Sequence, residues 1–238
     1  FIPLLYFTLR KAIPPVLIPR LYLLLILGGF QGVLGWYMVK SGLVDDPNVS
    51  QYRLTAHLGM AVFIYSLILW TVFDLSLNYN HAIRSRIKWM SSTLTLLIFL
   101  MILSGGLVAG TRAGIPFPTW PLMGDTFIPP QIYSMNPSWL SAFEDMATIQ
   151  FNHRMFAYLL TIFIVIFAIV LLGSNVPRFL KNGTTVLLFV LSLQVVLGIS
   201  TLLFYIPIPV AAAHQVGAIA LLSVSLFITH SCLSREQI

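Results

Sequence analysis

The 238-residue chain has a net charge of +6, yet only 8% of its residues are charged, 58% are hydrophobic, and its mean hydropathy is +0.91. So few charges cannot cover the surface of a soluble domain of this size, which excludes that class and predicts an all-α polytopic membrane protein. The basic residues stand in short loops without aromatic-interleaved runs, so the positive charge does not indicate nucleic-acid binding. The single cysteine, Cys232, excludes an intrachain disulfide.

Six hydrophobic segments are long enough to cross about 30 Å of hydrocarbon. We expect these spans at residues 21–39, 53–76, 89–111, 148–173, 184–206 and 209–230. Residues 1–9, with the sequence FIPLLYFTL, have the character of the last turns of an earlier span. Because the chain begins at Phe1, in the middle of a hydrophobic run, we expect an N-terminal portion to be missing. The connections are short except for residues 112–147, which are rich in proline, glycine and aromatic residues.

The charges between the spans predict the orientation in the membrane. Nine of the 13 basic residues fall on one side, and the positive-inside rule makes this side cytoplasmic, or the matrix side in a mitochondrion. These nine are Arg10, Lys11, Arg20, Arg84, Arg86, Lys88, Arg178, Lys181 and Arg235. The other four, on the outer side, are Lys40, Arg53, Arg112 and Arg154. The long loop 112–147 is therefore expected to be external.

A repeat relates the first two spans to the last two. The pattern Gln-x-Val-Leu-Gly occurs at residues 31–35 and again at 194–198, and the following span carries His57 or His214 respectively. The repeat predicts two pseudo-symmetric halves of four helices each, an eight-helix bundle with binding sites near the symmetry axis. About six of the eight helices, plus the tail of one more, are then present in this chain.

This repeat divides the chain into two parts. Residues 1–80 are the remainder of the N-terminal half, and residues 81–238 are the four-helix C-terminal half with the external loop. The alignment also predicts that the missing portion carries a counterpart of His153.

Three histidines are expected at one depth in the membrane. His57, His153 and His214 each lie about five residues inside the outer end of a span, or roughly 8 Å below that boundary. His81 and His230 lie toward the other side. A single histidine at such a depth more often forms a hydrogen bond between helices than it binds a metal. Three at one level, two of them in the same half, favour a pair of ligands.

The residue types available at this depth favour some cofactors over others. Zinc prefers four ligands, and the spans offer no third candidate at this depth. A proton relay would need acids within the spans, whereas Asp74 is the only acid near one and lies at its inner end. Haem iron needs two axial histidines from facing helices and an apolar slot, to which the small residues 211–213 and Gly217 are suited. Arg154, next to His153, is placed either to pair with a haem propionate or to reach lipid headgroups.

Several motifs together resemble the haem A synthase family, which supports the assembly of cytochrome c oxidase. They are QYRLTAHLG (51–59), SGGLVAGTRAG (104–114), TWPLMGD (119–125), FEDMATIQFNHR (143–154) and PVAAAHQVGAIALL (209–222). The resemblance covers essentially the whole chain. GWYMVKSGL (35–43) and Gln150 are more similar to the mitochondrial and proteobacterial branch, as is the absence of paired external cysteines.

The resemblance implies a fold, a reaction and a set of ligands. The family has eight transmembrane helices, and its C-terminal half holds haem b between two histidines that correspond to His153 and His214. Its N-terminal half binds the substrate haem, where His57 matches one ligand. The partner histidine and a catalytic glutamate belong to the missing helix. The family oxidises the C8 methyl group of haem O to a formyl group, with oxygen derived from water.

Two positions bear on this resemblance. Gln150 stands three residues before His153, where the catalytic half carries glutamate, which marks this copy of the motif as the cofactor half. Pro118 stands where the family more often has asparagine, which leaves a side-chain role at that position in doubt. Trp120, Met123 and Asp125 of the loop are expected either to cover the haem edge or to belong to an interfacial aromatic belt.

The resemblance also implies partners and a location. The expected partners are haem O as substrate, an electron donor, haem O synthase, cytochrome oxidase assembly factors and membrane lipid. We expect a bacterial inner membrane, with a mitochondrial inner membrane as the alternative, and haem sites toward the periplasmic or intermembrane side. The alternative function is a b-type cytochrome that passes electrons without modifying haem. A transporter is disfavoured because no span is broken at mid-depth.

Overall fold

The computed structural model describes residues 1–40, 49–77 and 82–233. Within these residues, six helices are long and apolar enough to cross a membrane, which confirms the number of predicted spans and the class of integral membrane protein. They are α2 (Ile18–Lys40), α3 (Gln51–Ser76), α4 (Ser85–Thr111), α6 (Met146–Leu172), α7 (Arg178–Leu203) and α8 (Ile208–Leu233). The short elements are α1 (Ile2–Leu9), η1 (Pro15–Leu17), η2 (Ser138–Leu140) and α5 (Ser141–Glu144).

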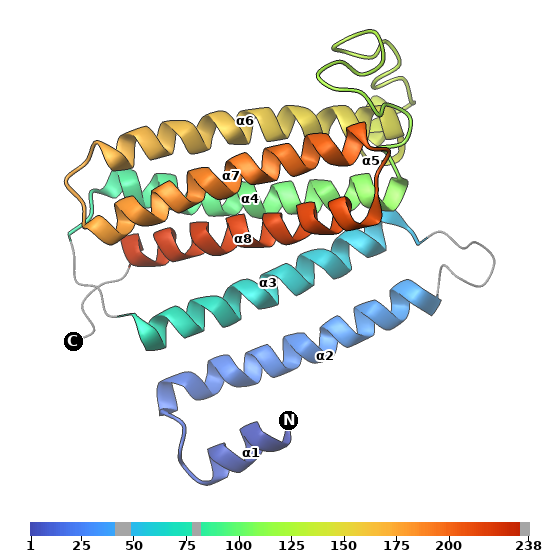
Figure 1. Cartoon of the computed structure of the whole chain (residues 1–238). Helices are drawn as coiled ribbons and strands as arrows, with labels where there is room; N and C mark the ends of the chain where they lie inside the picture. Colours follow the sequence, from blue (N-terminus) through green and yellow to red (C-terminus); the bar gives the residue numbers. More distant parts are fainter. Residues whose placement is uncertain (41–48, 78–81, 234–238) are drawn as a thin grey trace.

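The long helices lie side by side, with neighbours in the chain running in opposite directions (Figure 1). Helices α4, α6, α7 and α8 form a bundle, α3 packs against α4 and α8, and α2 packs against α3. Helix α8 is the most enclosed of the six, whereas α2 has no buried residue. The helices of residues 82–233 therefore form a compact unit, and α2 is attached to it through α3.

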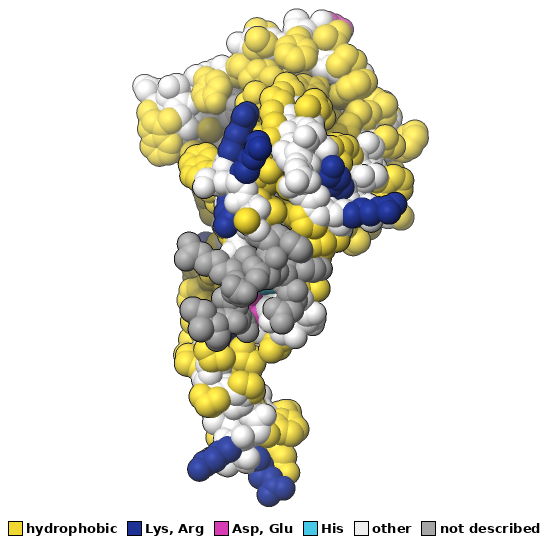
Figure 2. All heavy atoms as spheres, turned by 90° about the vertical axis from the view of Figure 1, so that its left-hand side faces the viewer, with side chains coloured by type: hydrophobic (Ala, Val, Ile, Leu, Met, Phe, Trp, Pro, Cys, Tyr) yellow, Lys and Arg dark blue, Asp and Glu magenta, His cyan; other side chains and the backbone are white. Residues whose placement is uncertain are grey.

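We call the two ends of the bundle the loop end and the basic end. The loop end carries the connection between α4 and α6, and the basic end lies opposite (Figure 1). Figure 2 looks onto the basic end and shows lysine and arginine side chains gathered there. The charge asymmetry that the sequence predicts is present in the described residues, while Arg235 lies outside them. Which end faces the cytoplasm stays a prediction.

Small residues allow α3 and α4 to approach closely. A Cβ atom added to Gly110 would lie 2.6 Å from the Cα atom of Gln51, and one added to Gly106 would lie 2.9 Å from the Oγ1 atom of Thr55. Within a membrane, close backbone packing of this kind replaces the hydrophobic driving force that water supplies to soluble bundles. The contact fixes α3, and with it His57, against the C-terminal bundle.

Hydroxyl groups tie α8 to its neighbours. The Oγ1 atom of Thr95 on α4 lies 2.7 Å from the Oγ atom of Ser225 and 2.8 Å from the Oγ1 atom of Thr229. The hydroxyl of Tyr65 on α3 lies 2.7 Å from the Oγ atom of Ser223. We call these five residues the hydroxyl ladder. Such bonds between membrane helices contribute about 0.6 kcal/mol each on average, so several together hold α8 firmly.

An ionic cluster joins three helices at the basic end. Asp74 on α3 accepts from Arg20 of α2 through Oδ2, and its Oδ1 lies 2.8 Å from the Nε2 atom of His230 on α8. The His230 ring packs edge-on against Trp70, with ring centroids 4.9 Å apart. An acid near the end of a membrane span is costly unless paired, and here both carboxylate oxygens have partners.

We expect Asp74→Asn to lower the free energy of unfolding by about 1.5–3 kcal/mol, because hydrogen bonds to charged groups contribute about this much. Denaturant unfolding of the purified protein in detergent measures the change. Asp125→Asn, on an exposed loop carboxylate, is the matched control and should leave stability unchanged. Equal stability of the two variants would contradict a stabilising role for the cluster.

Candidate functional site

The structure places the three predicted histidines at the loop end of their helices. His57, His153 and His214 lie six or seven residues after the first residues of α3, α6 and α8, and all three of these helices begin at the loop end. His230 lies at the basic end, bonded to Asp74. His81 lies outside the described residues. The common depth inferred from the sequence thus agrees with the helix bounds.

His214 is held by the neighbouring helix α7. Its Nδ1 atom lies 3.2 Å from the backbone carbonyl oxygen of Gln194. Because a carbonyl oxygen only accepts, this contact assigns the proton to Nδ1 and leaves a lone pair on Nε2. The amide nitrogen of Gln194 lies 3.5 Å from that Nε2 atom. A Cβ atom added to Gly198 would lie 2.9 Å from the ring carbon Cε1, so the imidazole rests directly on α7.

His153 is held in the same way from α4. The Oγ atom of Ser104 lies 3.1 Å from Nδ1 of His153, and a Cβ atom added to Gly105 would lie 3.6 Å from its Cε1 atom. Among the described residues, the Nε2 atom of His153 has no hydrogen-bond partner. The two imidazoles therefore belong to two helices of one bundle, and each is fixed through Nδ1. A hydrogen bond at Nδ1 orients an imidazole and leaves its Nε2 atom to bind a metal.

The surroundings of His57 repeat those of His214. A Cβ atom added to Gly35 on α2 would lie 2.9 Å from Cε1 of His57, the same distance as for Gly198 and His214. The amide nitrogen of Gln31 lies 3.4 Å from Nε2 of His57 and donates to its backbone carbonyl at 3.1 Å. In both helix pairs, α2–α3 and α7–α8, a glutamine and a glycine of the first helix contact the histidine of the second. One difference is that Nδ1 of His57 has no partner among the described residues.

Arg154 and Gln150 anchor the loop that follows α4. The buried Arg154 guanidinium donates to the carbonyl oxygens of Leu122 at 3.1 Å and Phe117 at 3.0 Å. Gln150 donates to the same Phe117 carbonyl at 3.0 Å. Arg154 contacts the loop here, and its role toward a propionate or a lipid headgroup stays a prediction. The acceptor next to Pro118 is the backbone carbonyl of Phe117.

Further contacts of the loop were not foreseen from the sequence. Trp120 donates to the hydroxyl of Tyr158 at 3.1 Å, and the Phe127 ring stacks on Tyr158 with centroids 6.5 Å apart. Glu144 accepts from Gln51 at 2.8 Å and from Tyr52 at 2.5 Å. The loop is therefore fastened to both α6 and α3. No local sequence pattern predicts these bonds, because each joins residues far apart in the chain.

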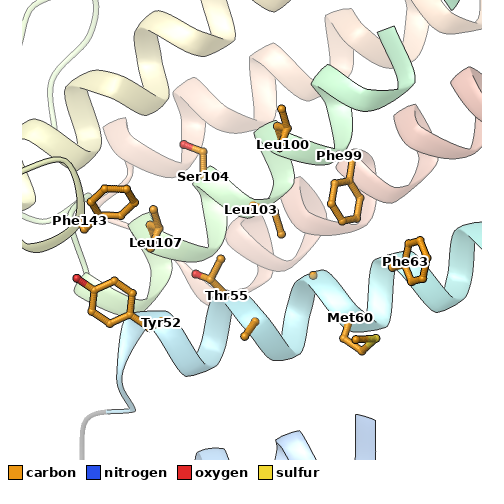
Figure 3. Close-up of a pocket in the computed structure, with 12 residues that line it drawn as sticks. Tyr52, Thr55, Met60, Phe63, Phe99, Leu100, Leu103, Ser104, Leu107 and Phe143 are labelled. Atoms are coloured by element: carbon orange, nitrogen blue, oxygen red, sulfur yellow. The ribbon is translucent and has the colours of Figure 1, made fainter. Parts of the chain in front are cut away.

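A cavity of about 690 Å³ opens between α3 and α4 (Figure 3). Its wall is almost wholly apolar, and its polar members include Ser104, the partner of His153. The labelled lining residues are Tyr52, Thr55, Met60, Phe63, Phe99, Leu100, Leu103, Ser104, Leu107 and Phe143. Ser104 thus lies both in the wall of this cavity and against the His153 imidazole.

The donor set fits haem better than a free metal ion. Among the described residues there is no group of three histidine, cysteine, aspartate or glutamate side chains able to hold an ion. Haem iron arrives with its equatorial ligands supplied by the porphyrin and asks the protein for axial ligands, which imidazoles provide. The Nε atom of Arg154 is buried without a partner in the described part of the chain, and a propionate would satisfy it.

Comparison with known proteins places the chain in a family. The sequence matches the family COX15-CtaA, described as cytochrome oxidase assembly protein, over residues 1–226. It is 45% identical to a heme A synthase of Nitrosospira multiformis over 97% of this chain and 66% of that protein. A heme A synthase of Parvibaculum lavamentivorans is 40% identical over 97% and 66% of the two chains. One from Nitrosomonas eutropha is 41% identical over 96% and 65%.

These relatives are bacterial, in agreement with the branch that the motifs indicate. The chain spans about 66% of the length of the first two. The match covers nearly all of the present sequence, including the three helices that carry the histidines. The chain therefore belongs to the COX15-CtaA family of cytochrome oxidase assembly proteins.

Proposed function

We propose that this chain is part of a haem A synthase, which oxidises the C8 methyl group of haem O to a formyl group. The observation that carries the proposal is the repeated arrangement of glutamine, glycine and histidine on α2–α3 and α7–α8. Two such arrangements suit two haems, one resident and one substrate. The names of the relatives supply the reaction class.

His153 and His214 are proposed as the axial ligands of a resident haem b. Both have Nδ1 engaged, by Ser104 and by the Gln194 carbonyl, so each offers Nε2 to the iron. His153 and His214 would hold this haem between them, and the haem would supply electron transfer. The protein's own contribution is to hold the two rings, to supply Arg154 for a propionate, and to keep water out with the apolar helices around them.

His57 is proposed as one ligand of the substrate haem. We propose that its partner histidine and a catalytic glutamate lie on a helix outside this sequence, within an eight-helix bundle of two halves. Residues 1–80 would then belong to the substrate half and residues 81–238 to the cofactor half. Gly35 and Gln31 contact the His57 ring and would hold it in place toward that haem.

The proposed surroundings follow from this role. Haem O is the substrate, an electron donor is required, and haem O synthase and cytochrome oxidase assembly factors are partners. We place the protein in a bacterial inner membrane with the loop end toward the periplasm. Basic side chains gather at the basic end (Figure 2), and the sequence has fewer of them on the loop side, which supports that orientation.

The test supplies haem O and a reductant system, under air, to the full-length protein, and follows the haem by mass spectrometry. We expect hydroxymethyl and formyl products, and we expect His57→Ala to abolish them because the substrate iron loses a ligand. The His57→Ala protein should keep the spectrum of the resident haem, which shows that it is folded. If electrons pass while the haem side chain never changes, the protein is instead a b-type cytochrome.

A further inference from the structure

Arg53 is a basic residue at the loop end that has no role in the function proposed above. Of the four basic residues predicted on the outer side, Arg154 already donates to two loop carbonyls. Arg53 lies in the first turn of α3, half-buried, beside the α2–α3 contact. We propose that Arg53 binds a carboxylate of the haem that His57 ligates. The proposal rests on the proposed function, because it requires a haem at His57.

The helix geometry places Arg53 above His57. The two residues are four positions apart on α3, so their side chains leave the same face of the helix one turn apart. With a rise of 1.5 Å per residue, Arg53 lies about 6 Å nearer to the loop end than His57. A haem held by His57 would lie beside this stretch of α3. Its propionate side chains, if directed to the loop end, reach the level of Arg53.

The partner helix α2 holds the guanidinium in place. The Cζ atom of Arg53 lies 5.0 Å from the centroid of the Tyr37 ring on α2. Stacking of this kind fixes the guanidinium plane while its edge nitrogens stay available as donors. Among the described residues, no carboxylate or carbonyl accepts a hydrogen bond from Arg53. The same helix supplies Gly35 against the His57 ring, so α2 sets the positions of both the ligand and the cation.

The second copy of the repeat differs at this position. The residue four before His214 is Val210, which carries no charge, whereas the residue four before His57 is Arg53. In the second copy the nearby cation is instead Arg154, which follows His153 on α6. The repeat therefore conserves the histidine and its glycine support while the cation comes from a different helix. A merely structural arginine of the repeat would be expected in both copies.

The chemistry that Arg53 offers is recognition of an oxyanion, and two sources exist at this depth. One is a haem carboxylate, and the other is the phosphate of a lipid headgroup. The two are separated by a probe in which the carboxylates are masked. Iron protoporphyrin IX and its dimethyl ester have the same iron and ring, but only the former has carboxylates to bind.

The experiment titrates the full-length protein, with its resident haem in place, with each of these two haems and follows the absorbance change. We expect Arg53→Gln to weaken binding of the free acid by roughly ten- to a hundredfold, the effect of one charge-assisted contact. Binding of the dimethyl ester should be unchanged. Arg53→Lys should restore part of the affinity, and Lys40→Gln, at another cation of the loop end, should have no effect.

Other outcomes identify what failed. Equal weakening of both haems by Arg53→Gln overturns the proposal, because the arginine then acts without a carboxylate. An effect that appears in nanodiscs of anionic lipid but not of neutral lipid, for both haems, assigns Arg53 to phosphate. Titration of His57→Ala gives the reference, since this variant should lose the added haem altogether. If it does not, the placement of the substrate at His57 fails, and with it the proposed function.

Discussion

Replacing either His153 or His214 by alanine is expected to abolish the low-spin haem spectrum of the purified protein. Low-spin iron requires a strong ligand on each axial side, and the structure offers one imidazole from α6 and one from α8. In the described part of the chain, these two are the histidines of α6 and α8 that lie at the loop end. The loss should therefore be complete in each single variant, and the double variant should look no different.

Reduced and oxidised absorbance spectra at equal protein concentration measure this effect. His57→Ala is the matched control, because its ring rests on a glycine of a different helix pair, and the resident-haem spectrum should persist. Free imidazole added to His214→Ala should restore part of the low-spin signal by filling the vacated position. An unchanged spectrum in both single variants would refute the ligand assignment.

Gly198→Ala is expected to weaken haem binding in the C-terminal bundle by about ten- to a hundredfold. The added methyl group would lie 2.9 Å from Cε1 of His214, which is closer than the imidazole can tolerate. The ring must move, and overpacking of this kind costs about 1–3 kcal/mol, or roughly tenfold in affinity per 1.4 kcal/mol. Helix propensity alone would favour alanine, so the steric effect opposes the intrinsic trend.

The repeat supplies an internal comparison for this substitution. Gly35→Ala presents the same 2.9 Å contact to His57. It should therefore weaken binding of the substrate haem and leave the spectrum of the resident haem unchanged. A Cβ atom added to Gly32, one turn away on the same helix, has no atom within 4 Å. Gly32→Ala should therefore leave the binding of both haems unchanged. Haem titration of the three variants, together with thermal unfolding, separates these effects. If the Gly198→Ala and Gly32→Ala proteins bind haem equally well, then the close contact of α7 with the His214 ring does not contribute to haem affinity.

The spans were predictable because hydropathy along the chain reflects the solvent in which each helix must lie. The residues at which the helices begin and end were harder to predict. The span expected at 89–111 begins instead at Ser85, since a helix continues through polar residues beyond the hydrocarbon as long as its backbone bonds remain internal. The relation between His57 and His214 was also accessible, because a repeat in the sequence becomes a repeat in space.

The neighbours of the histidines were only partly accessible. Gln31 and Gly35 lie four residues apart, on one helix face, and so a pattern existed from which their common target could be suspected. Ser104 carries no comparable signal, because its bond to His153 depends on how α4 packs against α6. For Arg154, charge and depth suggested two partners, and the structure shows a third kind. Backbone carbonyls such as that of Phe117 leave no mark in a sequence.

The hydroxyl ladder bears on whether the bundle is held together without haem. Its bonds tie α8 to α3 and α4 in the half of the bundle nearer the basic end, and none of them involves His57, His153 or His214. Separation of α6 from α8 at the loop end would leave every one of these bonds intact. The apoprotein thus has its own means of holding its helices together before any haem arrives. We therefore expect these bonds to hold the basic end of the bundle closed in the apoprotein.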